Sequence, residues 1–118
     1  MEVFWVFVGG GLGSLCRYGI ARALPLFDLP IATFLANAIS CLILGILIAL
    51  SAKGQLSNAQ RLLFMTGFCG GFSTFSTFAG ETLTLMQNGH HFYAMANILL
   101  SVLLGLVFIY LGLKIVGT

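Results

Sequence analysis

The sequence predicts an all-α membrane protein with four transmembrane helices, and three observations support this fold class. Of its 118 residues, 59% are hydrophobic and only 7% are charged, whereas a soluble domain carries about 25% charged residues. Apolar stretches long enough to cross a membrane follow one another along the chain, separated by short polar loops. The third stretch is interrupted by glycine and hydroxyl residues, which predicts a broken helix rather than a continuous one.

The chain is expected to form a single membrane domain over residues 1–118. Because a span needs about 20 mostly apolar residues, the spans are expected at roughly 3–24, 31–51, 61–87 and 92–116. The chain starts with Met1 and Glu2 rather than a basic segment, and the apolar run continues beyond the length of a signal-peptide core. We therefore expect the first span to be a mature helix and not a cleaved signal.

The first span combines small residues with one buried charge. Clustered glycines, which let two helices approach closely, fill its first half: Gly9, Gly10, Gly11 and Gly13. Arg17 lies some way in from the end of the span, where a charge is costly. It is expected either to reach water or bond backbone carbonyls, or to border a cavity and attract an anion.

The second span contains Asn37, with Thr33 and Ser40 at helical neighbour spacing. An asparagine in a membrane needs a hydrogen-bond partner. It can bond a neighbouring helix, or its amide can face a permeating ion. The sequence leaves both interpretations open.

The third span carries the segment Gly67–Phe78, in which glycines, hydroxyl residues and phenylalanines alternate. Glycine favours backbone that leaves helical geometry, and hydroxyls can satisfy the backbone groups that a break sets free. Non-helical backbone at membrane depth survives only where it is buried in protein or lines a watery cavity. We therefore expect a break near Gly70–Ser73 with a site beside it.

Beyond the expected break, Phe75 and Phe78 are three residues apart and share a helical face. Glu81 follows three residues later on roughly the same face. A carboxylate inside a span is a functional candidate, although Glu81 is close enough to the end of the span to reach water. The two phenylalanines can equally be packing residues.

Polar residues of the last third of the chain carry weaker signals. Asn97 and Ser101 are four apart and share one face of the fourth span, where Gly105 and Gly112 provide points of close packing. His90 and His91 are adjacent in a loop, without a third ligand, so we expect them to be surface residues. The cysteines, each in an apolar segment, are expected to be buried free thiols: Cys16, Cys41 and Cys69.

The charges are few and nearly balanced between the two ends of the spans. The net charge is +2 and no run of basic residues exists, which excludes nucleic-acid binding. Arg17 and Arg22 belong to one side, and Lys53, Arg61 and Lys114 to the other. Lys and Arg near the membrane determine orientation, so we expect the chain to insert both ways and to pair as an antiparallel dimer.

Three motifs resemble the small Fluc (CrcB) fluoride channels of bacteria. The segment Gly67–Phe78 is similar to the family pattern GFCGGxTTFSTF, and the stretch from Gly9 to Tyr18 resembles GGxxGxxxRY. Thr33 and Asn37 match a threonine and an asparagine four apart in the family's second helix. The resemblance covers nearly the whole chain, and the third-helix motif is highly specific.

The resemblance implies a multi-pass protein of the bacterial inner membrane that passively exports fluoride. It implies an antiparallel homodimer in lipid, with two pores and a central sodium ion held by the backbone carbonyls of Gly70 and Ser73. It also implies which residues border the ion pathway: Asn37, Phe75, Phe78, Ser76, Thr77, Glu81, Arg17 and Ser101. Departures from the pattern are Ser73 in place of threonine, and Ala32 and Ser40 where glycine is expected.

The chemistry of these residues suits fluoride. The ion is small and holds its water tightly, and hydroxyl and amide donors can replace that water. Aromatic rings have a positive edge, so an anion can rest beside Phe75 or Phe78 without a full positive charge. Conduction needs binding that is strong enough to enter and weak enough to leave.

Other classes of protein fit less well. A small dual-topology multidrug/proton exporter is the alternative, but it needs a carboxylate in the middle of the first helix, and only Glu2 is present, at the tip. An intramembrane enzyme would need paired catalytic groups at depth, and the sequence has none, so we expect no enzymatic activity. A structural subunit of a larger complex would give no ion flux on its own.

Overall fold

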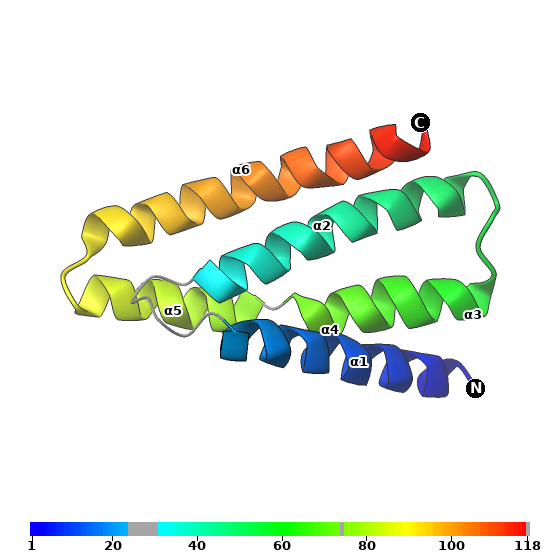
Figure 1. Cartoon of the computed structure of the whole chain (residues 1–118), viewed down its shortest axis with the longest axis horizontal. Coiled ribbons are helices and arrows are strands. Elements are labelled where there is room, and N and C mark those ends of the chain that lie inside the picture. The colour runs from blue at the N-terminus through cyan, green and yellow to red at the C-terminus, as the bar shows by residue number, and fades with distance from the viewer. Residues whose placement is uncertain (24–30, 74, 118) are drawn as a thin grey trace.

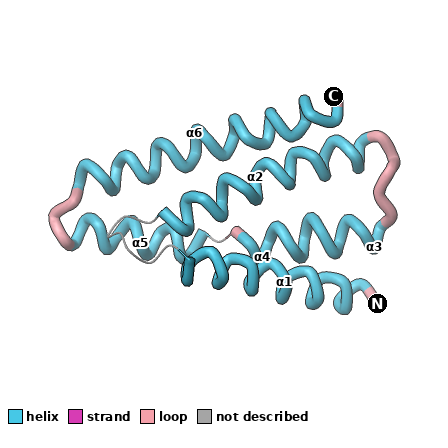
Figure 2. Tube along the Cα trace, viewed as in Figure 1, coloured by secondary structure: helices cyan, strands magenta, loops and turns pink. Residues whose placement is uncertain are grey.

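The computed structural model describes residues 1–23, 31–73 and 75–117. Its regular elements are all helical (Figures 1 and 2): α1 (Glu2–Ala23), α2 (Ile31–Ala52), α3 (Asn58–Gln60), η1 (Arg61–Cys69), α4 (Gly70–Phe72), α5 (Phe75–Gln87) and α6 (His91–Val116). The short elements α3, η1, α4 and α5 follow one another and together form the third long rod of the chain.

In the part of the chain that the structure describes, four helical segments are long and apolar enough to cross a membrane, which confirms the predicted number of spans. They are Glu2–Ala23, Ala32–Ala52, Asn58–Gln87 and His91–Val116. The third segment begins three residues before the expected Arg61 because Ser57 caps it. The Ser57 hydroxyl accepts from the Gln60 backbone N–H at 3.1 Å, and the Gln60 side chain accepts from the Ser57 N–H at 2.9 Å, a reciprocal capping box.

The four rods form a slab made of two helix pairs. α1 packs along η1 and α4, and α2 packs along α6. The slab measures 48 × 30 × 20 Å, and both termini lie at the end that holds the α2–α3 connection, opposite the α5–α6 turn (Figure 1). Lys53 belongs to that first end, where its Nζ donates to the carbonyl of Val116 at 2.9 Å.

Glycines form the contact surface within each pair. A Cβ placed on Gly9 or Gly13 would lie less than 3.0 Å from backbone atoms of the third rod, and a Cβ on Gly45 or Gly112 would approach the facing backbone of the α2–α6 pair as closely. Small residues at these points let backbones touch, which is how helices associate where no hydrophobic effect drives them together. By contrast, a Cβ on Gly11 would meet no heavy atom of the described chain within 4 Å.

The third rod is bent at Ser73. Its φ of −99° and ψ of 150° are extended, whereas Gly70, at φ −65° and ψ −36°, is helical. The bend therefore lies at the C-terminal end of the expected Gly70–Ser73 range. The preceding nine residues, Arg61–Cys69, form a π-helix, a rare conformation that the sequence analysis did not predict.

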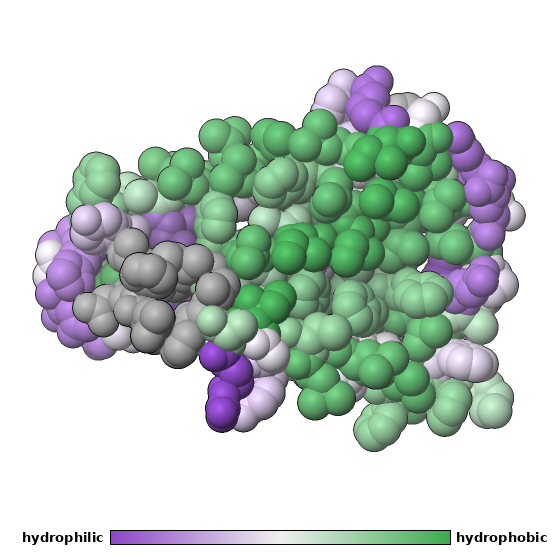
Figure 3. Space-filling view, in the orientation of Figure 1, coloured by the Kyte–Doolittle hydropathy of each residue, from purple (hydrophilic) through white to green (hydrophobic). Residues whose placement is uncertain are grey.

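The face of the slab seen in Figure 3 is apolar over its middle, and hydrophilic residues gather mainly towards its two ends. The expectation of three buried thiols is wrong in part: Cys69 is buried, but Cys41 is half-buried and Cys16 is exposed, although all three are free. Cys16 lies on the outer face of α1, which an apolar membrane can cover as well as protein can.

Candidate ion pathway at the bend of the third rod

An open groove of about 280 Å³ lies beside the bend. Residues of three separate rods line it: Asn37 and Cys41 from α2, Ser73, Phe75 and Phe78 from the bend and α5, and Ser101 and Val102 from α6. The fold thus brings together five residues that the sequence analysis placed beside an ion pathway or a cation: Asn37, Ser73, Phe75, Phe78 and Ser101.

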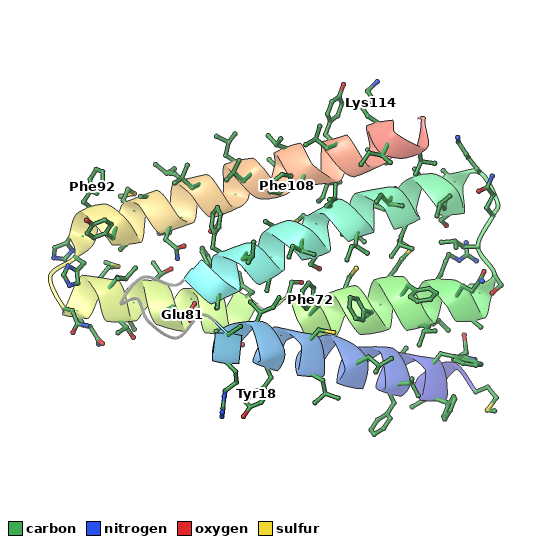
Figure 4. All side chains as sticks on the ribbon, in the orientation of Figure 1. Tyr18, Phe72, Glu81, Phe92, Phe108 and Lys114 are labelled. Carbon is green, nitrogen blue, oxygen red and sulfur yellow. The ribbon has the colours of Figure 1, made fainter. Side chains whose placement is uncertain are left out.

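The two phenylalanines form one aromatic wall of the groove. Because Phe75 and Phe78 stand one turn apart on α5, their ring centroids lie 5.9 Å from each other, with an angle of 47° between the planes. Phe75 is 78% exposed, whereas Phe72, the last helical residue before the bend (Figure 4), is only 3% exposed. The bend therefore separates a packed phenylalanine from one that faces open space.

The carbonyl of Cys69 anchors the bend. It accepts from the Ser73 N–H at 3.1 Å, from the Ser73 hydroxyl at 2.8 Å and from the Ser40 hydroxyl of α2 at 3.3 Å. Ser40 is 2% exposed and stands where the resemblance led us to expect glycine. Its hydroxyl gives α2 a hydrogen bond to the helix that ends here, since a residue without a side chain could not provide one.

On the other side of the groove, a row of polar groups joins α5 to α6. The Thr82 hydroxyl donates to the Phe78 carbonyl at 2.8 Å, and the Asn97 Nδ2 donates to Thr82 Oγ1 at 2.9 Å. The Ser101 hydroxyl donates to Asn97 Oδ1 at 3.4 Å. The row starts and ends at residues that line the groove.

Arg17 lies away from the groove lining. Its Nε donates to the carbonyl of Gly71 at 3.2 Å, which joins α1 to α4. This is the backbone bond that the sequence analysis gave as one of two alternatives for the charge.

Unlike Phe75, three polar residues that follow it on α5 do not belong to the described lining of the groove: Ser76, Thr77 and Glu81. Ser76 is exposed and Thr77 is half-buried. Glu81 is half-buried one turn beyond Phe78 (Figure 4). Its Oε1 is enclosed and has no hydrogen-bond partner among the described residues.

A cation at the bend would depend on backbone oxygens. Within residues 1–23, 31–73 and 75–117, no group of three or more His, Cys, Asp or Glu side chains could hold a metal ion. Ser73 has extended backbone, which turns its carbonyl away from the helix axis. Gly70 is exposed, and a Cβ on it would meet no described atom within 4 Å, so its backbone is accessible from outside. Carbonyl oxygens of this kind suit a hard cation.

Cys41 and Val102 line the groove although the sequence analysis gave them no role there. Cys41 lies one helical turn after Asn37, and Val102 directly follows Ser101. Helical spacing from Asn37 could have identified Cys41, but an apolar thiol among aliphatic residues gave no chemical reason to select it.

Comparison with known proteins places this chain among relatives that match nearly its whole length. Residues 4–113 match the family model of the CrcB-like protein, Camphor Resistance (CrcB). A protein of Pyrococcus abyssi named fluoride-specific ion channel FluC is 44% identical over 107 residues, which are 89% of this chain and 87% of that protein. Proteins of the same name from Methanococcus aeolicus and Bacteroides fragilis are each 38% identical, over 94% of this chain and 91% and 92% of their own lengths.

Proposed function

The chain belongs to the CrcB-like family, and from that premise we propose that it is a fluoride-specific ion channel that lets fluoride leave the cytoplasm passively. The single observation that carries the proposal is the groove at the bend. It combines an amide at Asn37, a hydroxyl at Ser101 and the rings of Phe75 and Phe78. This set suits a small anion that must exchange its water for weak donors.

In the proposed mechanism, the groove replaces water without a fixed full charge. The Asn37 amide and the Ser101 hydroxyl donate to the ion, and the positive ring edges of Phe75 and Phe78 face it. We propose that Ser76, Thr77 and Glu81 border the continuation of the path along α5, and that Arg17, held on Gly71, lies near its entrance. A Lys or Arg within the groove would hold an anion too tightly to release it.

Membership of this family argues against an enzyme, and the structure offers little support for a proton-coupled exporter. The only carboxylate of α1 is Glu2, which is exposed at the end of the helix. An exporter of that kind needs a carboxylate at membrane depth to carry the proton. The other acidic residue that the structure describes is Glu81, and it belongs to the third rod.

We propose that two copies of the chain pair in antiparallel orientation and give two pores. The groove of one copy is open, and Phe75 in its wall is 78% exposed. An ion path cannot be open to lipid, because hydrocarbon offers no donors to an anion. A second copy over this face would close the groove. The basic residues favour neither orientation strongly, since Arg17 and Arg22 belong to one side and Lys53, Arg61 and Lys114 to the other.

We further propose that the carbonyls of Gly70 and Ser73 of both copies hold a sodium ion where the two bends meet. When bound, the ion would supply positive charge that favours an anion nearby. The exposed backbone of Gly70 and the extended conformation of Ser73 support this proposal. We propose that the channel lies in the plasma membrane. That this membrane is the inner membrane of a bacterium is a prediction from the resemblance.

Efflux from liposomes tests the proposal. The purified chain is reconstituted, and fluoride release is followed with a fluoride electrode, with sodium present on both sides or replaced by N-methylglucamine. We expect rapid fluoride efflux with sodium, slower efflux without it, and no chloride efflux under the same gradient. Liposomes that release no fluoride in either buffer would contradict the proposed channel, and equal rates in the two buffers would contradict the sodium site alone.

A further inference from the structure

We infer that Asn97 and Thr82, which lie outside the lining of the groove, direct the hydroxyl proton of Ser101 and so weaken fluoride binding in the groove. Both act through Ser101 and are therefore positioning residues. The inference rests on the proposed function, because it concerns the affinity of the same groove for the same ion.

The inference starts from a ladder of hydrogen bonds between α5 and α6. The ladder runs from the Phe78 carbonyl to Thr82 at 2.8 Å, from Thr82 to Asn97 at 2.9 Å and from Asn97 to Ser101 at 3.4 Å. Thr82 is only 6% exposed, so water does not readily replace its partners. Phe78 and Ser101, the two ends of the ladder, both line the groove.

The direction of every bond in this ladder follows from its first member. The Phe78 carbonyl can only accept, so Thr82 must give it the single proton of its hydroxyl. The oxygen of Thr82 can then only accept, which requires the nitrogen of the Asn97 amide to face it. The amide oxygen therefore faces Ser101, and because that oxygen can only accept, Ser101 is the donor.

This direction matters for an anion in the groove. While the Ser101 proton points to Asn97, the hydroxyl can present only its oxygen lone pairs to an ion in the groove. Lone pairs repel fluoride. The bond of 3.4 Å is long for a hydroxyl donor, so an arriving fluoride can draw the proton away from Asn97 at a small cost. Ser101 is thus a weak and releasable donor, as ion conduction requires.

Thr82→Val tests this inference, because valine keeps the shape of threonine but neither donates to Phe78 nor accepts from Asn97. The amide of Asn97 is then free to turn its nitrogen towards Ser101, which leaves the Ser101 proton for fluoride. We expect the half-saturating fluoride concentration for flux to fall about threefold, because fluoride no longer has to break the weak hydrogen bond from Ser101 to Asn97. Efflux at a series of fluoride concentrations measures it.

Thr84→Val is the matched control. The Thr84 hydroxyl also donates to the carbonyl four residues back, that of Gly80, at 3.0 Å. Thr84 is exposed on the same helix and takes no part in the ladder, so its replacement is expected to leave the half-saturating concentration unchanged. Asn97→Leu is a second variant, since it also frees the Ser101 proton, and it is expected to shift the concentration in the same direction.

The decisive experiment introduces Thr82→Val and Asn97→Leu into a protein that already carries Ser101→Ala. In that background, we expect neither substitution to shift the half-saturating fluoride concentration. Each protein is first checked for elution as a single species. If the half-saturating fluoride concentration still shifts without the Ser101 hydroxyl, the inference is overturned. It is also overturned if Thr82→Val and Thr84→Val have equal half-saturating concentrations. Either result leaves the proposed channel intact. Absence of fluoride flux from the unsubstituted protein would instead overturn the proposed function and this inference with it.

Discussion

At the scale of single residues, the carbonyl of Cys69 joins the last turn before the bend to α2. It keeps its helical partner, the N–H of Ser73, four residues later. It also accepts from the hydroxyls of Ser73 and Ser40, so two side chains hold the turn from which the rod bends. Ser40 was expected only as a polar neighbour of Asn37 and as a departure from the family pattern, because nothing in the sequence places it beside Cys69.

Ser40→Ala is therefore expected to destabilise the fold. Removal of one buried hydrogen bond costs about 0.5–1.5 kcal/mol, and the remaining donors from Ser73 limit the loss. Thermal unfolding in detergent measures it, with Ser14→Ala as the control because Ser14 is exposed on α1. Equal melting temperatures for the two variants would show that the Ser40 bond does not support the bend.

Residue types explain which site residues could be predicted and which could not. The chemistry of Asn37, Phe75, Phe78 and Ser101 left packing and ion contact both open, and the family resemblance led us to expect them beside an ion pathway; the groove does bring them together. The bond between Asn97 and Thr82 could not be predicted. It joins residues 15 positions apart, and only the register of α5 against α6 determines it.

At the scale of elements, the contact between α1 and the third rod depends on two pairs of glycines at four-residue spacing. These are Gly9 and Gly13 on α1, and Gly67 and Gly71 on the third rod. A Cβ on Gly13 would press against backbone atoms of Phe68 and Phe72, and a Cβ on Gly71 against the backbone of Gly10. Backbone atoms cannot turn aside as a flexible side chain can. The position of the bend is thus held from α1 as well as from α2.

Gly13→Ala is expected to force α1 away from the third rod. Overpacking of this kind costs about 1–3 kcal/mol, which should appear as a lower melting temperature and a smaller yield of folded protein. Gly11→Ala is the control on the same helix, because its added methyl group meets no described atom within 4 Å. Two variants of equal stability would contradict the close contact.

The two unusual segments of the third rod differ in how well they could be predicted. Glycine and hydroxyl residues predicted a break, because glycine favours non-helical backbone and hydroxyls can bond the backbone groups that a break sets free. They could not determine its position, and Gly70 stays helical while Ser73 bends. The π-helix Arg61–Cys69 has no compositional signature comparable with that of glycine or proline, so no residue pattern could indicate it.

At the scale of the whole molecule, the slab leaves large apolar areas uncovered. α6 is exposed along most of its length, and the groove is open beside Phe75. Lipid can cover the first surface but not the second, because an ion path needs a wall of donors or rings. This is why the proposed function includes a second, antiparallel copy of the chain.

Dual insertion has its own test. The basic residues are nearly balanced, so a reporter fused to the C-terminus is expected to be found on both sides of the membrane. The double substitution of Gln55 and Asn58 by lysine adds two positive charges to the α2–α3 end, which already carries Lys53, Arg61 and Lys114, and should give one orientation and little flux. Flux should return when a chain biased in the opposite way is expressed with it. A reporter confined to one side in the unsubstituted protein would contradict dual insertion.

The account as a whole claims that fluoride passes through the groove beside the bend, along the ring of Phe75. The most direct measurement compares fluoride efflux from liposomes that hold the unsubstituted protein, Phe75→Ile or Phe92→Ile. Phe75 and Phe92 are 78% and 79% exposed, but only Phe75 lines the groove. The account predicts that Phe75→Ile abolishes efflux and still elutes with the size of the unsubstituted protein, while Phe92→Ile conducts normally. Full efflux from Phe75→Ile would contradict it.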